Sequence, residues 1–254
     1  MRLNYKVLGE GQALIVLHGL FGSLDNWITL AKSWSEEYQV FLIDQRNHGQ
    51  SPHADEFSYE LMANDLRDFI LENQLHEPII LGHSMGGKTA MKFALEYPDL
   101  LSKLIVVDIA PVSYEVHHYG IIAALESLDL NEIASRKQAD QELSIRINEF
   151  GVRQFLLKNL YRKEKDEFAW RFNLPVIKRE IIPISEWESA EKNYQGTTLF
   201  IKGAKSNYIL PEYYEQITNQ FPNHELEEIA NAGHWVHAEA REPFFEAVRS
   251  FMKV

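Results

Sequence analysis

A serine flanked by glycines is the residue of this sequence most suited to covalent chemistry. The segment Gly82-His83-Ser84-Met85-Gly86 matches G-x-S-x-G, with an apolar run, Ile79–Leu81, before it and a helix-forming stretch, residues 88–96, after it. A serine on such a strand-to-helix turn has strained backbone angles, and glycines two residues to either side prevent a collision. The N-terminus of the helix would direct partial positive charge toward a developing oxyanion. We therefore predict that Ser84 is a nucleophile; the alternative is an incidental serine in a glycine-rich turn.

A nucleophilic serine needs a base, and the sequence has ten histidines. His234, in Ala232-Gly233-His234-Trp235, follows the last predicted strand and keeps the chain order serine, aspartate, histidine. His237 comes three residues later, but because no third ligand is evident we interpret it as loop scaffold and not as part of a metal pair. His117 and His118 are adjacent and cannot share a helix face, so we expect no metal there either. His234 is the predicted base.

The acid that should orient this histidine is missing from its usual place. The loop after the next-to-last strand reads Gly203-Ala204-Lys205-Ser206-Asn207, so that Ser206 occupies the acid position, and the next carboxylate is Glu212. A serine cannot carry the charge that stabilises an imidazolium. One strand earlier, the run Leu104–Val107 ends in Asp108, the known alternative position for this acid. We predict that Asp108 is the acid; the alternative is that it caps the first turn of the segment that follows.

The developing oxyanion needs two backbone N–H groups at about 3 Å. Met85, the residue after the nucleophile, offers the first. The second should come from the loop His18-Gly19-Leu20-Phe21-Gly22, where Gly19 permits a sharp turn. We predict Leu20, and not Phe21, as the second donor; the alternative is that these residues only pack.

Short apolar runs that end in glycine, aspartate or histidine must position these side chains. They are Ala13–Leu17, Val40–Ile43, Pro78–Leu81, Leu104–Val107, Thr198–Lys202 and Leu226–Ile229. Runs of this kind are typical of strands buried on both faces of a parallel sheet, and helix-like stretches such as Tyr59–Gln74 alternate with them. The sequence therefore predicts an α/β fold with a mostly parallel central sheet flanked by helices, opened by an antiparallel strand at Leu3–Val7.

The alternation lapses between residues 112 and 185, where apolar residues recur at helical spacings. An insertion between two strands of a parallel sheet lies over their carboxyl ends, where ligands bind in open α/β folds. We therefore predict a helical cap at residues 112–185, inserted after the strand that follows the nucleophile, and a core made of residues 1–111 and 186–254.

Two groups of cap side chains are candidates for substrate contact. The apolar candidates for an acyl wall are Phe155, Leu156, Trp170 and Phe172. Ordinary core packing is the favoured interpretation for most of them. The basic residues Arg162, Lys163 and Lys165 could contact a phosphate, but we favour a solvated helix face that they form with Glu164 and Asp166.

A second polar cluster follows another predicted strand. Asp44, Arg46 and His48 come directly after Val40–Ile43 and could be mistaken for a separate site. We favour a structural role, in which charge-assisted hydrogen bonds tie loops together.

Composition excludes several classes of function. The net charge of −12 over 254 residues argues against nucleic acid, since phosphate contacts need a basic surface. Without cysteine there is no disulfide, thiol nucleophile or thiolate metal site. The start, Met1–Lys6, lacks the apolar core of a signal peptide, and the apolar runs are too short to cross a bilayer. We expect a soluble cytoplasmic protein that binds neither nucleic acid nor membrane.

Several blocks of the sequence resemble the YbfF-type bacterial esterases of the α/β-hydrolase superfamily. They are residues 18–27, 44–51, 82–88, 108–112, 170–175 and 233–239. They span nearly the whole chain, the predicted cap included. The resemblance implies an esterase with a helical cap that acts on short acyl esters, with acyl-CoA thioesters as further candidates. It also implies an acid after the strand that follows the nucleophile, which agrees with Asp108.

The expected reaction forms an acyl-enzyme on Ser84. His234 takes the serine proton, Asp108 holds the imidazole ring, and the N–H groups of Leu20 and Met85 receive the oxyanion. Water then releases the acyl group, and no metal or organic cofactor is required. Two alternatives stay open: a ligand receptor of the same fold with slow or single turnover, and a carbon–carbon bond hydrolase, which would use the same three residues.

Overall fold

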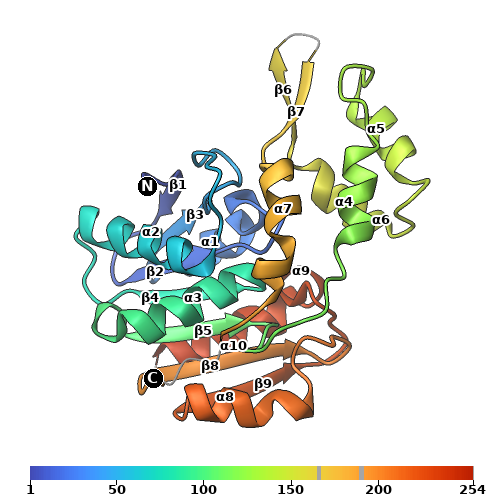
Figure 1. Ribbon diagram of the computed structural model, residues 1–254. Helices are drawn as coiled ribbons and strands as arrows, with labels where there is room; N and C mark the ends of the chain where they lie inside the picture. The colour runs from blue at the N-terminus through green and yellow to red at the C-terminus, as the bar shows by residue number, and fades with distance from the viewer. Residues whose placement is uncertain (165–166, 189–191, 254) are drawn as a thin grey trace.

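A mostly parallel sheet forms the centre of the computed structural model, which describes residues 1–164, 167–188 and 192–253 (Figure 1). The sheet has seven strands in the order β1-β3-β2-β4-β5-β8-β9. Their bounds are β1 Tyr5–Leu8, β2 Ala13–Leu17, β3 Gln39–Ile43, β4 Ile79–His83, β5 Lys103–Val107, β8 Thr197–Gly203 and β9 His224–Ile229. Strand β1 pairs antiparallel with β3, and every other pair in this sheet is parallel. The carboxyl ends of β4, β5 and β8 therefore meet at one edge.

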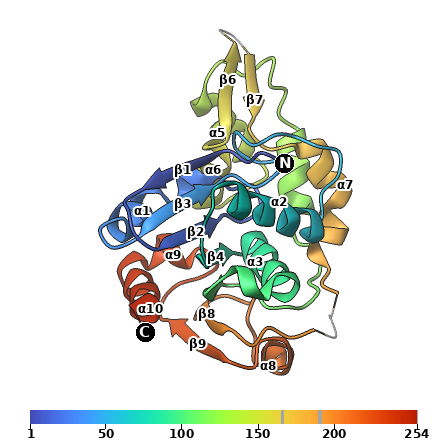
Figure 2. The ribbon, with the colours of Figure 1, turned by 90° about the vertical axis from the view of Figure 1, so that its left-hand side faces the viewer.

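Helices cover both faces of this sheet (Figure 2). Those packed on one face are α2 Tyr59–Glu72, α3 Met85–Glu96 and α8 Tyr214–Gln220; those on the other are α1 Ile28–Trp34, α9 Val236–Glu239 and α10 Arg241–Lys253. Short 3-10 turns lie at Leu24–Asn26, Pro98–Leu100 and Pro211–Tyr213. All of β2 is buried because its side chains alternate between the two helical layers. Strand and helix thus alternate as the sequence predicts.

Strand β9 departs from the predicted burial. It forms the edge of the sheet, four of its six residues are exposed, and Leu226 keeps 36% of its surface accessible. The expectation of burial on both faces is therefore wrong for Leu226–Ile229. Charged side chains at Glu225, Glu227 and Glu228 lie on this strand, and such residues protect an edge from pairing with another chain.

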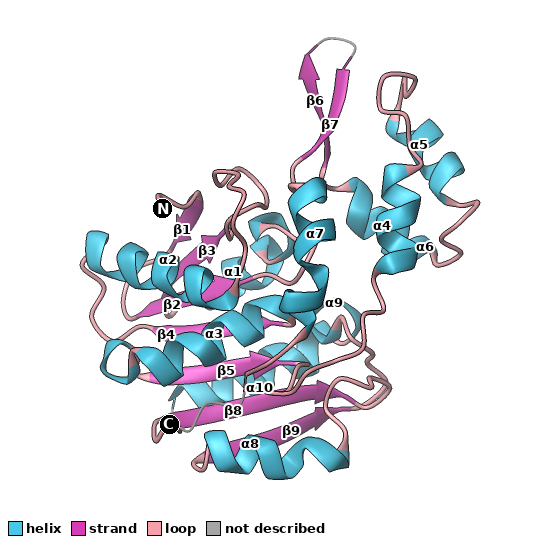
Figure 3. Ribbon diagram, viewed as in Figure 1, coloured by secondary structure: helices cyan, strands magenta, loops and turns pink. Residues whose placement is uncertain are grey.

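The segment between β5 and β8 carries its own small core. It contains α4 Tyr119–Glu126, α5 Arg136–Leu143, α6 Phe150–Leu157, β6 Leu160–Glu164, β7 Glu167–Trp170 and α7 Leu174–Ser185. Its apolar side chains pack together and against Phe21, Tyr59 and Met85, which belong to the elements around the sheet. The segment projects beyond one side of the sheet (Figure 3). Its position between β5 and β8 is that of the insertion predicted from the sequence.

A β-hairpin interrupts the helices of this segment and corrects one expectation. Strands β6 and β7 pair antiparallel, so Arg162 and Lys163 lie on a strand and not on a helix face. Aromatic residues such as Phe168 favour strand pairing. The guanidinium of Arg162 lies 4.7 Å from the centroid of this ring on the opposite strand. Lys165 and Asp166, which we also assigned to that face, lie outside the described residues.

Among the helices that the structure describes, none is long and apolar enough to cross a membrane.

Candidate active site

The turn between β4 and α3 holds Ser84 in a strained conformation. Its φ and ψ angles are 54° and −118°, outside the regions that a residue with a side chain normally occupies. A Cβ atom on Gly82 would lie 2.1 Å from the carbonyl oxygen of Gly86, and one on Gly86 would lie 2.5 Å from that of Leu17. Only glycine fits at these two positions, which explains the spacing of the motif.

The three residues predicted to act together lie in one chain of hydrogen bonds. His234 Nε2 is 3.0 Å from Ser84 Oγ, and His234 Nδ1 is 2.7 Å from Asp108 Oδ2. The imidazole also stacks on Tyr208, with 4.1 Å between ring centroids. The carboxylate is completely buried, whereas the His234 side chain keeps 22% of its surface accessible. A buried carboxylate beside one imidazole nitrogen and a serine hydroxyl beside the other can move a proton away from the serine.

Asp108 makes contacts that exclude the alternative of a helix cap. Its Oδ1 accepts a hydrogen bond from Gly203 N at 3.0 Å, and its Oδ2 accepts one from the Ser206 hydroxyl as well as facing His234. Ser206 therefore contacts the carboxylate from the position where the acid itself is usually found. From the sequence, Ser206 was identified only as the residue that stands where the acid is usually found. Its hydroxyl, a hydrogen-bond donor at that position, was the signal that could have identified it as a partner of Asp108.

The backbone around the nucleophile distinguishes between the two candidate donors to an oxyanion. Phe21 N already donates to His48 Nε2 at 3.2 Å, and Phe21 O accepts from Asn159 Nδ2 at 2.7 Å. In the described part of the chain, no hydrogen bond takes up the N–H of Leu20 or of Met85. Met85 also begins α3, where the first N–H groups lack partners within the helix. The geometry thus favours Leu20 over Phe21.

The neighbouring histidines are buried and engaged in the scaffold. His83 Nε2 lies 2.9 Å from the backbone oxygen of His234, and the His237 ring stacks on Trp27 at 4.2 Å between centroids. Burial lowers the pKa of His237 to about 3 and that of His83 well below its usual range, with nearby His234 adding to both shifts. Both rings are therefore neutral near pH 7, and His237 has the scaffold position that we predicted. Within the described residues, no group of three or more potential ligands could hold a metal ion.

The second polar cluster ties loops together, as the sequence suggested. Asp44 accepts hydrogen bonds from the backbone N–H of Leu24 at 2.8 Å and of Gln50 at 2.9 Å. Arg46 contacts both oxygens of Asp65, at 2.6 and 2.9 Å. The side chains of Arg46 and Asp65 are only 7% and 4% exposed, so this pair is part of the interior.

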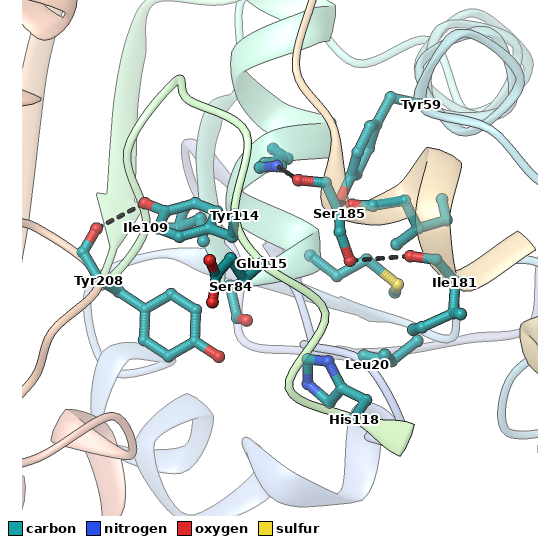
Figure 4. Close-up of a pocket in the computed structure, with 13 residues that line it drawn as sticks. Leu20, Tyr59, Ser84, Ile109, Tyr114, Glu115, His118, Ile181, Ser185 and Tyr208 are labelled. Atoms are coloured by element: carbon teal, nitrogen blue, oxygen red, sulfur yellow. Dashed lines mark hydrogen bonds between the residues drawn. The ribbon is translucent and has the colours of Figure 1, made fainter. Parts of the chain in front are cut away.

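Two pockets open on Ser84, and they share only three of the described residues: Leu20, Ser84 and His118. The first, of about 420 Å³, runs between Tyr114, Tyr208 and the end of α7; Figure 4 shows its lining. Its residues are Leu20, Tyr59, Ser84, Met85, Lys88, Ile109, Tyr114, Glu115, His118, Ile181, Ile184, Ser185 and Tyr208. The second, of about 540 Å³, extends toward α6 and includes His234 and Trp235.

Of the cap side chains predicted as acyl walls, two line a pocket. Phe155 and Leu156 line the second pocket, whereas Trp170 and Phe172 stack on each other with 5.1 Å between centroids and line neither pocket. His118, which our sequence analysis considered only as a metal ligand, lies where the two pockets meet. Its Nδ1 is buried and has no hydrogen-bond partner among the described residues, and burial lowers the pKa of the ring to about 4.

Comparison with known proteins identifies the family of this chain. The family described as "alpha/beta hydrolase fold" matches residues 12–240. The chain is 40% identical to the sn-1-specific diacylglycerol lipase ABHD11 of Mus musculus, over 98% of this chain and 85% of that protein. It is 38% identical to the esterase YbfF of Escherichia coli, over 94% of this chain and 92% of that protein. A solved structure, "Marine microorganism esterase", superposes with a TM-score of 0.96 at 44% identity and covers 98% of both chains.

These relatives confirm the predicted fold class, the resemblance to YbfF-type esterases and the predicted class of enzyme, a carboxylic ester hydrolase. The family match covers most of the chain, and the relatives span it almost end to end. The chain belongs to the α/β-hydrolase family.

Proposed function

We propose that this protein hydrolyses carboxylic esters through an acyl-enzyme on Ser84. One observation carries the proposal: the hydrogen-bonded chain from Ser84 through His234 to Asp108 begins where two pockets meet. His234 takes the serine proton as Ser84 attacks the acyl carbon, and Asp108 stabilises the imidazolium. The N–H groups of Leu20 and Met85 stabilise the oxyanion.

The second half of the reaction uses the same groups. His234 gives its proton to the departing alcohol, then takes one from the water that attacks the acyl-enzyme. Residues 112–185 act as a cap that covers Ser84 and supplies walls to both pockets, for example Ile184 and Phe155. This assignment makes the cap a contributor to specificity and not to the chemical step.

Among ester classes, we propose small acyl esters first and thioesters second. The mouse relative is named a diacylglycerol lipase and the bacterial one an esterase, and both names indicate an acyl group on oxygen. For acyl-CoA, the basic residues Arg162 and Lys163 lie on the hairpin and line neither pocket beside Ser84. A cytoplasmic location is part of the same proposal.

The test is steady-state turnover of p-nitrophenyl butyrate by wild type and by Ser84→Ala. We expect many turnovers in wild type and a loss of about 10⁴-fold or more in kcat in the variant, since removing the nucleophile leaves only binding and the oxyanion donors. A single slow turnover in wild type, with a large shift in melting temperature, would instead identify a ligand receptor. Retention of wild-type turnover in Ser84→Ala would contradict the proposal.

A further inference from the structure

The two pockets beside Ser84 differ in their relation to the base. His234 and Trp235 line the second pocket, whereas the described lining of the first contains neither. Leu20 and His118 border both pockets, and among the described residues the N–H of Leu20 has no hydrogen-bond partner. The carbonyl carbon of a bound ester must therefore lie at the junction, with one arm of the ester in each pocket.

The position of the base decides which arm enters which pocket. After Ser84 attacks, the imidazolium of His234 must give its proton to the oxygen of the leaving group, and a proton moves only between atoms within hydrogen-bond reach. The C–O bond to the alcohol then breaks, while the acyl carbon stays bonded to Ser84 Oγ. The leaving oxygen must consequently lie on the side of Ser84 that faces His234.

We propose that the first pocket binds the acyl group and the second binds the alcohol. This assignment rests on the proposed function and deepens it, because it names the residues that select each arm of the ester. Ile181 and Ile184 of α7 then set the size of the acyl group, and Val152 and Phe155 of α6 select the alcohol.

The far wall of the acyl pocket is firmly held. The hydroxyl of Tyr59 donates to Ile184 O at 2.7 Å, and Lys88 Nζ donates to the backbone oxygens of Ser185 at 2.9 Å and Glu186 at 3.0 Å. Lys88 is only 2% exposed, and it comes one helical turn after Ser84 on α3. Burial lowers the pKa of Lys88 to about 7, and its protonated form stabilises the negative C-terminal end of α7. The nucleophile and the acyl wall are thus joined through one side chain, and the acyl pocket has a fixed end.

The part of the alcohol pocket's wall that α6 supplies is apolar, whereas the polar side chains of Asn26 and His83 also line this pocket. Phe155 and Trp235 lie 5.8 Å apart between ring centroids, and Val152 and Phe155 are only half-buried. Apolar walls of this kind favour an alcohol with an apolar arm. The α6 wall is therefore the part of the site that should select the apolar arm of the alcohol.

Two matched truncations test the assignment, one in each pocket. Ile184→Ala enlarges the acyl pocket and Phe155→Ala the alcohol pocket; Ile181→Ala is a second acyl-pocket variant in case Ile184→Ala does not fold. One series of p-nitrophenyl esters varies the acyl chain from acetate to decanoate. A second series varies the alcohol of acetate esters and is followed by acid release. Stopped-flow bursts separate acylation from deacylation.

Deacylation gives the sharpest readout, since the alcohol has left by then. We expect Ile184→Ala to change the deacylation rate and to move the preferred acyl chain to greater length. Phe155→Ala should change the ranking of alcohols in kcat/KM by about tenfold, the effect of about 1.4 kcal/mol, with a deacylation rate like that of wild type. The reverse pattern, or equal effects of both variants on deacylation, would overturn the assignment while leaving the acyl-enzyme intact. If no substrate gives an acyl-enzyme on Ser84, the proposed function and the assignment both fail.

Discussion

Two buried carboxylates follow strands of the same sheet, and their surroundings differ. Asp44, after β3, is 2% exposed and receives its hydrogen bonds from loop atoms such as Leu24 N and Gln50 N. Asp108, after β5, is 0% exposed and faces His234, whose other nitrogen faces Ser84 at the junction of two pockets. The first carboxylate ends a network within the interior, whereas the second begins one that reaches the two pockets at Ser84.

Burial and charge alone therefore do not mark a reactive group. The Arg46–Asp65 pair near Asp44 is almost as buried as Asp108, yet its atoms are taken up by each other, by the N-terminal ammonium of Met1 and by the backbone. A reaction requires atoms that the protein leaves available to a substrate. In the proposed site these are the hydroxyl of Ser84 and the N–H groups of Leu20 and Met85. We therefore expect substitutions around Asp108 to reduce turnover and substitutions in the cluster of Asp44 and Arg46 to reduce stability.

The largest expected effect is on turnover, at Asp108. Asp108→Asn keeps the shape of the side chain but removes the charge that stabilises the imidazolium and holds its tautomer. We expect kcat to fall by about 10⁴-fold. The melting temperature should stay close to that of wild type, as measured by circular dichroism. Wild-type turnover in Asp108→Asn would show that another group orients His234.

Moving the carboxylate from position 108 to position 206 tests the same role of charge. Ser206 already contacts Asp108 Oδ2 from the usual acid position, so Ser206→Asp in the Asp108→Asn background returns a carboxylate to the site. We expect this double variant to recover part of the lost kcat. Ser206→Asn in the same background is the matched control and should recover nothing; equal recovery in both would argue against a role of charge.

The next effect is on stability, at Arg46. Arg46→Met leaves the buried carboxylate of Asp65 with the N-terminal ammonium of Met1, at 3.0 Å, as its charged partner, and we expect a loss of about 2 kcal/mol in the free energy of unfolding. Urea denaturation measures this loss. Turnover per folded molecule should stay within about threefold of wild type, because no step of the reaction uses Arg46. A fall of 10²-fold or more in kcat, measured well below the melting transition, would mean that this cluster contributes to the chemistry.

The hydroxyl of Ser206 gives a smaller effect on turnover. Ser206→Ala removes one hydrogen bond from the Asp108 carboxylate, and a bond to a charged group is worth about 1.5–3 kcal/mol. Because part of this energy is present throughout the reaction, we expect kcat/KM to fall by about tenfold and its pH profile to shift. Ser206→Thr, which keeps the hydroxyl, should restore both; an unchanged profile in Ser206→Ala would reduce Ser206 to a packing residue.

The smallest effect concerns pH and the buried histidines of the scaffold. Burial lowers the pKa of His48 to about 3 and that of His18 to about 4, while both rings titrate near 6.5 when unfolded. Below about pH 6.5 the unfolded chain binds protons that the folded chain does not, so the free energy of unfolding must fall as pH falls toward 4. Each such histidine contributes a slope of about 1.4 kcal/mol per pH unit.

His48→Gln tests this slope, since the amide oxygen can still accept a hydrogen bond from Phe21 N. Denaturation midpoints in urea between pH 7 and 4.5 should show a slope smaller by about one proton than in wild type. An identical slope in the variant would mean that His48 takes up its proton in the folded state as well.

How much could be predicted from the sequence depended on the range of the interactions. The elbow at Ser84 and the missing carboxylate at 206 are local patterns, and both led to residues that the structure brings together. Most walls of the first pocket were missed because Tyr59, Lys88 and Tyr208 come from three distant elements and share no pattern along the chain. These three residues become neighbours only because α7 packs against α3 and against the loop after β8.

The hairpin at residues 160–170 was missed for a related reason. Its run of charged residues fits a solvated helix as well as a strand, and the pairing is decided by contacts across it, such as that of Arg162 with Phe168. Strand β9 shows the same limit, since a short run cannot tell an edge strand from a central one.

Mass spectrometry can show directly whether the acyl group passes through Ser84. Wild type is mixed with a p-nitrophenyl ester, quenched in acid within the burst, digested and mapped. We expect one acylated peptide, with the acyl group on Ser84, and no such peptide from Ser84→Ala. In His234→Ala the same adduct should form far more slowly, because no base takes the serine proton. Release of the acid with no adduct on any peptide, or an adduct at another residue that persists in Ser84→Ala, would contradict an acyl-enzyme on Ser84.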